Sequence, residues 1–317
     1  HVLYSTPSRL REFPQADWRF LIGTARNLAA IIHQVHSDGM VVGDINEGNI
    51  LVFKDSTVKL VDVDSFQVEV NGRALPCEGG VPLFTPPELH GKVFANTPRT
   101  PNHDAFGLAV MIFQLLFMGR HPYAGRFKGG TADLTIEGAI GGFRFAYGSD
   151  AAALHMQPPP LTLPSEGVGP QVLHLFDRAF GPGSAHSPRP TPLEWYEALQ
   201  QLDKSLKTCT SFRSHVYFQP MSSCPWCGLL AHSVVLFQLD RTSNTFDLNV
   251  FEQSLAQIAR PAAYAAPHLG SIAAPSLPPL LHDRSLPWKE RSQRAIDLVN
   301  TCEQAVESAR NRWTSFL

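Results

Sequence analysis

Apolar residues recur at three- and four-residue steps between Ala16 and His36, the spacing that puts side chains on one face of an α-helix. Gly39 follows, and glycine is common just past a helix end. The pattern therefore predicts an amphipathic helix over 16–36 that ends before Gly39. Its apolar positions are Trp18, Leu21, Ile22, Ala25, Leu28, Ile32 and Val35.

Two short β-branched runs come next, Ile50 to Phe53 and Val58 to Val63, separated by the turn-forming Lys54-Asp55-Ser56. They predict one small hairpin. Pro- and Gly-rich segments then alternate with helices expected at about 103–118, 171–180 and 192–206. The first 205 residues are thus expected to be mostly helical, with a single hairpin.

The longest apolar stretch, Phe106 to Met118, falls short of the roughly 20 residues that a membrane span needs, so we interpret it as a buried helix. Beyond residue 240 the pattern predicts a helix near 250–258 and an extended or irregular linker, rich in Ala, Pro and Ser, over 261–287. A terminal helix follows, and its small heptad seam favours folding back on its own chain over pairing with a second copy. The seam contains Ala295, Val299, Cys302, Val306, Ala309 and Trp313.

The chain has 317 residues, of which 44% are hydrophobic and 17% charged, with a net charge of −2. These values predict a soluble protein of about two domains, and they argue against a nucleic-acid or acidic-membrane partner. Five cysteines in this length do not make a dense disulfide framework, and no signal segment opens the chain. We therefore expect a cytoplasmic protein, and the start at His1 predicts a fragment.

Four soft metal ligands lie within nineteen residues: Cys209, His215, Cys224 and Cys227. Three thiolates and one imidazole are the ligand set that tetrahedral zinc prefers. A redox Cys-x-x-Cys pair and four unrelated buried residues are the alternatives, but the two further ligands favour a structural zinc site. Strands are expected on either side, at 216–218 and 234–237. Cys77 and Cys302 have no predicted partner.

The segment from His36 to Val52 resembles the catalytic loop of protein kinases, whose pattern is H-R-D-x-x-x-x-N. Asp44 and Asn49 have that spacing, and Asp62, thirteen residues later, stands in the place of D-F-G. By this resemblance Asp44 is the catalytic base, while Asn49 and Asp62 hold Mg²⁺ on the phosphates of ATP.

Further motifs occur in the order that the family shows. Gly80 to Glu88 resembles the G-T-x-x-Y-x-A-P-E segment, and Asp104 to Ala109 resembles the D-x-W-S-x-G start of the large buried helix. Arg189 stands where the family places an arginine that pairs with the glutamate of A-P-E, here Glu88. The resemblance therefore gives Glu88, Asp104 and Arg189 architectural roles.

Several positions depart from the family pattern. Val42-Gly43 replaces H-R, so the arginine that would bind an activation-loop phosphate is missing, and residues 66–84 contain no Ser, Thr or Tyr. We predict that this segment carries no phosphate switch. Asn46 replaces a lysine and Val81 a threonine, and in the family both of those side chains meet the catalytic aspartate.

Val63 and Asp64 replace the phenylalanine and glycine of D-F-G. Asp64 either helps to bind a second cation or caps a turn, and the turn preference of aspartate favours the second. No lysine precedes Lys54 and no glycine-rich loop precedes Asp44, so nothing resembles the small lobe. Either the chain begins at the hinge, Val2-Leu3-Tyr4, through truncation, or the small lobe is truly absent, and we favour truncation.

The resemblance implies a mainly α fold: the large lobe of an atypical bacterial Ser/Thr kinase over 1–206, a zinc-ribbon-like module over 207–240, and terminal helices with their linker over 241–317. The implied function is ATP- and Mg²⁺-dependent phosphorylation of a protein, and some such kinases act with a von Willebrand-type protein and a metal-dependent phosphatase. The alternative is a pseudokinase scaffold, which Gly43, Asn46 and Val81 favour.

Overall fold

The computed structural model describes residues 2–70, 72–130 and 134–240, together with single positions 290, 293 and 297. The chain divides into one unit over residues 1–245 and another over 246–317. The predictions of a helix near 250–258, a linker over 261–287, a heptad seam from Ala295 to Trp313 and a free Cys302 lie outside the described residues.

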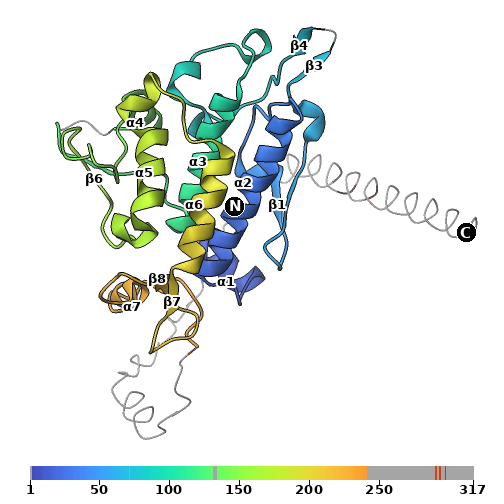
Figure 1. The fold of residues 1–317 in the computed structure, drawn as a ribbon. Coiled ribbons are helices and arrows are strands. Elements are labelled where there is room, and N and C mark those ends of the chain that lie inside the picture. The colour runs from blue at the N-terminus through green and yellow to red at the C-terminus, as the bar shows by residue number, and fades with distance from the viewer. Residues whose placement is uncertain are drawn as a thin grey trace, which may run out of the picture. The chain divides into compact units, whose positions relative to one another are not determined.

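The main layer consists of helices that run side by side in Figure 1. Helix α2 packs on α3 and α6, and α5 packs on the same two helices. The observed ends lie within two residues of those predicted. The helices are α2 (Trp18–Ser37), α3 (Pro101–Leu116), α5 (Gly169–Phe180) and α6 (Pro192–Lys204).

Helix α2 has a capping feature at each end. The side chain of Asp17 caps its start by accepting a hydrogen bond from the Phe20 amide at 2.9 Å. At the other end Gly39 adopts φ +77°, and the Met40 amide donates to the Val35 carbonyl at 3.1 Å. This pair of features is a Schellman motif, which lets the chain leave α2 directly into the catalytic-loop segment.

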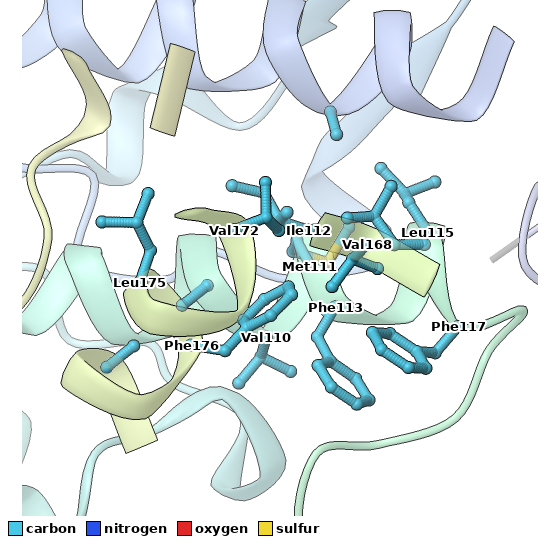
Figure 2. Packing of buried hydrophobic residues seen from close by; sticks show 14 of the residues in the cluster. Val110, Met111, Ile112, Phe113, Leu115, Phe117, Val168, Val172, Leu175 and Phe176 are labelled. Carbon is cyan, nitrogen blue, oxygen red and sulfur yellow. The ribbon is translucent and has the colours of Figure 1, made fainter. Parts of the chain in front are cut away.

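Helix α3 forms the centre of the core, since every residue from Asp104 to Leu116 is buried. Phe113 stacks on Phe117, with 4.1 Å between ring centroids, and meets Phe176 of α5 edge-on at 5.0 Å. Figure 2 shows these rings packed together with aliphatic side chains of α3 and α5. The interdigitated packing fixes α3, and with it the polar residue Asp104 in its first turn.

The described residues contain small two-stranded antiparallel sheets rather than the single hairpin predicted within the first 205 residues, so that expectation is wrong. Strands of two or three residues are too short to show a periodic pattern, although Asn71-Gly72 is a strong hairpin signal. The pairs are β1 (Ile50–Val52) with β2 (Val58–Leu60), β3 (Val68–Val70) with β4 (Arg73–Leu75), β5 (Arg126–Phe127) with β6 (Met156–Gln157), and β7 (Leu206–Thr208) with β8 (Val216–Phe218).

The β3–β4 hairpin lies at one end of the helical layer, and β7, β8 and α7 lie at the other (Figure 1). No helix in the described ranges has both the length and the apolar character that crossing a bilayer would require. The shorter helices are α1 (Thr6–Glu12), α4 (Ile136–Gly141) and α7 (Pro225–Leu230). Turns of 3₁₀ helix occur at Glu47–Asn49, Val63–Ser65, Pro82–Phe84, Pro87–Leu89, Phe94–Asn96, Ser165–Val168 and Pro182–Ala185.

The strand predicted at 234–237 is wrong, because this segment is irregular. Its apolar pattern reflects side-chain burial instead of strand pairing. Phe237 is fully buried, and its ring lies 5.1 Å from that of Trp226 and 5.3 Å from the guanidinium of Arg9. A short apolar run of this kind does not distinguish a strand from a packed loop.

We expect the buried ring of His121 to make the folded protein less stable in acid. Its Nε2 donates to the Leu83 carbonyl at 2.9 Å, and burial lowers its pKa from 6.5 to about 4. As the pH falls, His121 is therefore protonated in the unfolded chain before it is protonated in the folded one. The free energy of unfolding should fall by on the order of 2–3 kcal/mol between pH 7 and pH 4.5. Urea unfolding at both pH values measures this, and His121→Gln should flatten the dependence. An unchanged dependence in the variant would contradict the assignment.

Candidate functional site

The carboxylate of Asp104 holds the start of the catalytic-loop segment. Its two oxygens accept hydrogen bonds from the backbone amides of Val42 and Gly43, both at 2.8 Å. His36, at the end of α2, donates from Nε2 to the same carboxylate at 2.9 Å. The Asp104 side chain is 1% exposed, so these donors compensate a charge that has lost its water.

Gly43 stands where the family has an arginine, and the structure gives a physical reason for glycine. Its φ is +79°, a conformation that residues with a Cβ rarely adopt. A Cβ built on Gly43 would also lie only 2.5 Å from the Cβ of Cys77. Cys77 lies in the segment from Asp62 to Glu88, which we call the activation segment after the kinase segment between D-F-G and A-P-E that it resembles. This segment thus packs directly on the Gly43 backbone, where a side chain would otherwise stand.

Asp44, Asn46 and Asn49 form one hydrogen-bonded turn. The Asn46 amide nitrogen donates to Asp44 Oδ1 at 2.9 Å, and its oxygen accepts from the Gly48 amide at 2.8 Å. The Asn49 amide nitrogen donates to the Asp44 carbonyl at 3.0 Å. These hydrogen bonds fix the rotamers of both asparagine side chains. Because the Asn49 amide nitrogen donates within the turn, its amide oxygen can accept a hydrogen bond or bind a cation.

Asp62 lies beside this turn along the β1–β2 hairpin. The amide of Val61 donates to the Asn49 carbonyl at 3.0 Å, so the backbones that carry Asn49 and Asp62 are neighbours. Asp62 adopts a left-handed φ of 60° and is exposed. Asp64 is exposed within the 3₁₀ turn Val63–Ser65, the setting in which aspartate is a common turn residue.

Glu88 and Arg189 make a bidentate ion pair, with Arg189 donating at 2.6 and 3.0 Å. These are the two residues that the motif alignment pairs. Burial acts to raise the pKa of Glu88, but the guanidinium outweighs it and the pKa falls below its usual value. The pair ties the end of the activation segment to the loop before α6.

An apolar pocket of about 310 Å³ lies next to the turn that Asp44, Asn46 and Asn49 form in the catalytic-loop segment, which we call the catalytic turn. Leu51 contributes to its wall and is 50% exposed, and Glu47 and Gly48 of the catalytic loop also line it. The remaining lining residues come from the start of the chain, from α2 and α3, and from strand β1. They include Val2, Leu3, Tyr4, Leu28, Met111 and Leu115.

A second site groups Cys209, His215, Cys224 and Cys227, whose ligand atoms all lie within 4.8 Å of one another. His215 Nδ1 is 3.5 Å from Cys227 Sγ and 3.7 Å from Cys224 Sγ, and the Cys209 and Cys227 sulfurs are 3.6 Å apart. A zinc ion about 2.3 Å from sulfur and 2.0 Å from nitrogen produces ligand separations of about this size. Burial lowers the pKa of His215, which keeps the ring neutral, as a metal ligand must be.

The four ligands come from two local structures. Cys209 follows β7 and His215 precedes β8, so the first pair closes one hairpin. Cys224 occupies the N-cap position of α7 and Cys227 lies within that helix, which begins at Pro225, a position where proline is favoured. A hairpin and a helix, rather than two hairpins, therefore hold the cluster.

The ring of Trp226 joins this cluster to the helical layer. Its centroid lies 5.5 Å from that of Trp18 on α2, and its indole nitrogen donates to the Val216 carbonyl at 2.6 Å. Arg9 on α1 makes a second link, because its buried guanidinium donates to the carbonyls of Leu3 and Leu236 at 2.7 and 2.6 Å. The Cys/His cluster is thus joined to α2 through Trp226, and the loop after it is joined through Arg9 to Leu3, one of the residues that line the apolar pocket.

Two residues that lie at the catalytic turn, Arg99 and Gly79, were not predicted from the sequence. Arg99, from the loop before α3, donates to the carbonyls of Gly43 and Gly79. Gly79 approaches Asp44 so closely that a Cβ there would lie 3.1 Å from Asp44 Oδ2. No local pattern marks Arg99, since its partners are 56 and 20 positions away.

The buried Asp104, the turn of Asp44 and Asn49 and the Glu88–Arg189 pair thus bring together the residues that carry the resemblance to protein kinases. Sequence comparison agrees, and the chain belongs to the protein kinase-like superfamily. No protein-family model matches it.

Within the superfamily the chain is similar to Protein kinase YegI of Escherichia coli O157:H7 and of strain K12. Each is 40% identical over 269 residues, which cover 83% of this chain and 42% of the relative. NUAK family SNF1-like kinase 1 of Mus musculus is 26% identical over 124 residues, 39% of this chain and 18% of that protein. The chain spans less than half the length of the YegI relatives.

Proposed function

We propose that this chain is the large-lobe part of a kinase that transfers the γ-phosphoryl group of ATP to a Ser or Thr of a partner protein. The observation that carries the proposal is the ordered turn of Asp44, Asn46 and Asn49 next to Asp62. Phosphoryl transfer depends on positioning of the reacting groups and on neutralisation of their charge. This turn supplies oxygen atoms in fixed positions for both tasks.

Asp44 is the residue that would accept the proton of the substrate hydroxyl. Its Oδ1 is held by Asn46, while its Oδ2 faces the backbone of Gly79. Asn46 therefore orients the Asp44 carboxylate, one of the roles that the family's lysine has at this position. As a neutral amide it brings no positive charge to the transferring group.

Asn49 and Asp62 fit a Mg²⁺ ion by their chemistry. Mg²⁺ takes hard oxygen ligands, commonly one or two from the protein together with phosphates and water. The Asn49 amide oxygen and the exposed Asp62 carboxylate, carried on neighbouring backbones, offer this set. When bound, the ion would neutralise charge on the phosphates of ATP.

The apolar pocket beside the turn suits a flat aromatic base. Leu28, Leu51 and Met111 present aliphatic carbon to it, and the half-exposed side chain of Leu51 leaves surface for a ligand to cover. Glu47 lies at the same pocket and offers a polar group close to the Asp44 turn. The pocket supports nucleotide binding next to the phosphate-handling residues.

A pseudokinase scaffold is the second candidate. Val81 replaces the threonine of the family pattern and cannot hydrogen bond to Asp44, and Asn46 lacks the charge of lysine. Such a protein would bind nucleotide in the same pocket with little or no transfer.

Asp44→Asn should reduce phosphoryl transfer by about 10²-fold or more, since a general base contributes on that scale. The measurement is incorporation of the ³²P γ-phosphate of ATP by the full-length protein, both into itself and into a generic protein substrate. The matched control is Asp55→Asn, which removes a different carboxylate, the one in the turn between β1 and β2. This variant should retain the wild-type rate.

Equal rates for wild type and Asp44→Asn would contradict the role of Asp44. Nucleotide binding by the wild type without any transfer would favour the scaffold. Asp62→Asn tests the Mg²⁺ site whichever outcome is found, because it should weaken Mg²⁺-dependent nucleotide binding by an active kinase and by a scaffold alike.

We also propose that Cys209, His215, Cys224 and Cys227 bind one structural zinc ion. Their separations suit a tetrahedral site, and all four positions are filled by protein, which leaves no open position for chemistry. The ion would then hold the β7–β8 hairpin to α7, and so keep Trp226 against Trp18.

Elemental analysis should find about one zinc per chain, in line with four ligands for one ion. Cys224→Ser should lose it and unfold at a lower temperature, while the control Cys77→Ser should keep it. Because Trp226 is 1% exposed, loss of the metal should also shift tryptophan emission to longer wavelength before the helical layer melts. Metal-free protein with an unchanged melting temperature would argue against a structural ion.

A further inference from the structure

Arg99 lies in the loop between the turn Phe94–Asn96 and helix α3, and is 4% exposed. One guanidinium nitrogen donates to the Gly43 carbonyl, and another donates to the Gly79 carbonyl at 2.7 Å. The same group lies 3.8 Å from the centroid of the Phe94 ring. A single buried cation therefore binds the catalytic loop and the activation segment at once.

The backbone of Arg99 makes a second set of links through Gln67. The Gln67 side chain accepts from the Arg99 amide at 2.6 Å and donates to the Arg99 carbonyl at 2.8 Å. The Gln67 backbone in turn pairs with Val41, in both directions, at 3.0 and 2.8 Å. The beginning of the activation segment and the beginning of the catalytic loop are thus fastened to the same residue.

These contacts surround the catalytic carboxylate. Gly43 immediately precedes Asp44, and Gly79 lies against its Oδ2. A guanidinium can hold two carbonyls because it presents several N–H donors in a rigid plane, whereas a lysine ammonium acts as a point donor. Gly43 itself cannot supply such a group, since Cys77 fills the space where its side chain would stand.

We propose that Arg99 is a positioning residue for phosphoryl transfer, fastening the activation segment to the catalytic loop without any phosphate. This inference rests on the proposed function. In phosphate-switched kinases, an arginine beside the catalytic aspartate binds a phosphorylated activation loop. Here the arginine comes from the loop before α3 and binds main-chain carbonyls, so the link does not depend on a phosphate group.

The charge around Arg99 agrees with this role. Burial lowers the pKa of Arg99, while the carboxylates of Asp104 and Asp44 act in the opposite direction. An arginine stays charged at neutral pH under such conditions. Arg99 therefore also restores positive charge near Asp44, where Asn46 has replaced a lysine.

The test compares Arg99→Gln and Arg99→Lys with wild type in the full-length protein. Arg144→Gln is the matched control, because Arg144 likewise donates to a backbone carbonyl, that of Leu154 at 2.7 Å, and lies 4.8 Å from the ring centroid of Phe127. Kinase rates and amide hydrogen exchange over residues 41–49 and 76–84 are the readouts.

We expect kcat of Arg99→Gln to fall by about 10²-fold, with a smaller fall for Arg99→Lys. KM for ATP should change by less than about 2-fold, because the apolar pocket does not include Arg99. Amide exchange should accelerate in both segments for the Arg99 variants and in neither for Arg144→Gln.

A kcat within about 2-fold of wild type in both Arg99 variants would overturn the proposal, as would an equal fall in Arg144→Gln. If Arg99→Gln does not fold, Arg99→Lys decides alone. Should the wild type show no transfer, the proposed function fails, but the exchange comparison still tests whether Arg99 fastens the two segments. Unchanged exchange would then reject that as well.

Discussion

The buried carboxylate of Asp104 is the interaction on which the rest of the site depends. A charge at 1% exposure is tolerated only if its oxygens are hydrogen bonded, and here the donors are the amides of Val42 and Gly43 and the ring of His36. The need to satisfy this charge fixes the backbone directly before Asp44. Because Asp104 sits on α3, the most buried helix of the described core, the packing of aromatic rings around Phe113 sets where the catalytic turn lies.

Arg99 and Asp104 act on opposite groups of the same short segment. Asp104 accepts from the amide of Gly43, and Arg99 donates to its carbonyl. The peptide on each side of Gly43 is thus held by a buried charge of the sign that suits it. Glycine at this position, which from the sequence looks like the loss of an arginine, lets Cys77 of the activation segment pack on the loop. The contact is made in a segment whose residues 66–84 contain no Ser, Thr or Tyr.

The parts of this account that sequence predicts are those with local or ordered signals. The stripe from Trp18 to Val35 and Gly39 predicted α2. The ordered motifs predicted membership of the protein kinase-like superfamily. Arg99 and Gln67 were missed because their contacts join segments distant in the chain, and such pairings leave no periodic trace. The strand at 234–237 was predicted wrongly for a related reason, since Phe237 is buried by Arg9 and Trp226 rather than by a neighbouring strand. The predicted roles of Asp44, Asn49 and Asp62 stay proposals.

If Asn49 and Asp62 share one cation beside Asp44, paramagnetic Mn²⁺ should bind there in place of Mg²⁺ when it is added with ADP to isotope-labelled full-length protein. We expect the side-chain amide signal of Asn49 and the backbone signals around Asp62 to broaden together. Asp62→Asn should abolish both effects, while signals around Asp55 stay sharp. Broadening that spares Asn49, or that persists in Asp62→Asn, would rule out a shared cation.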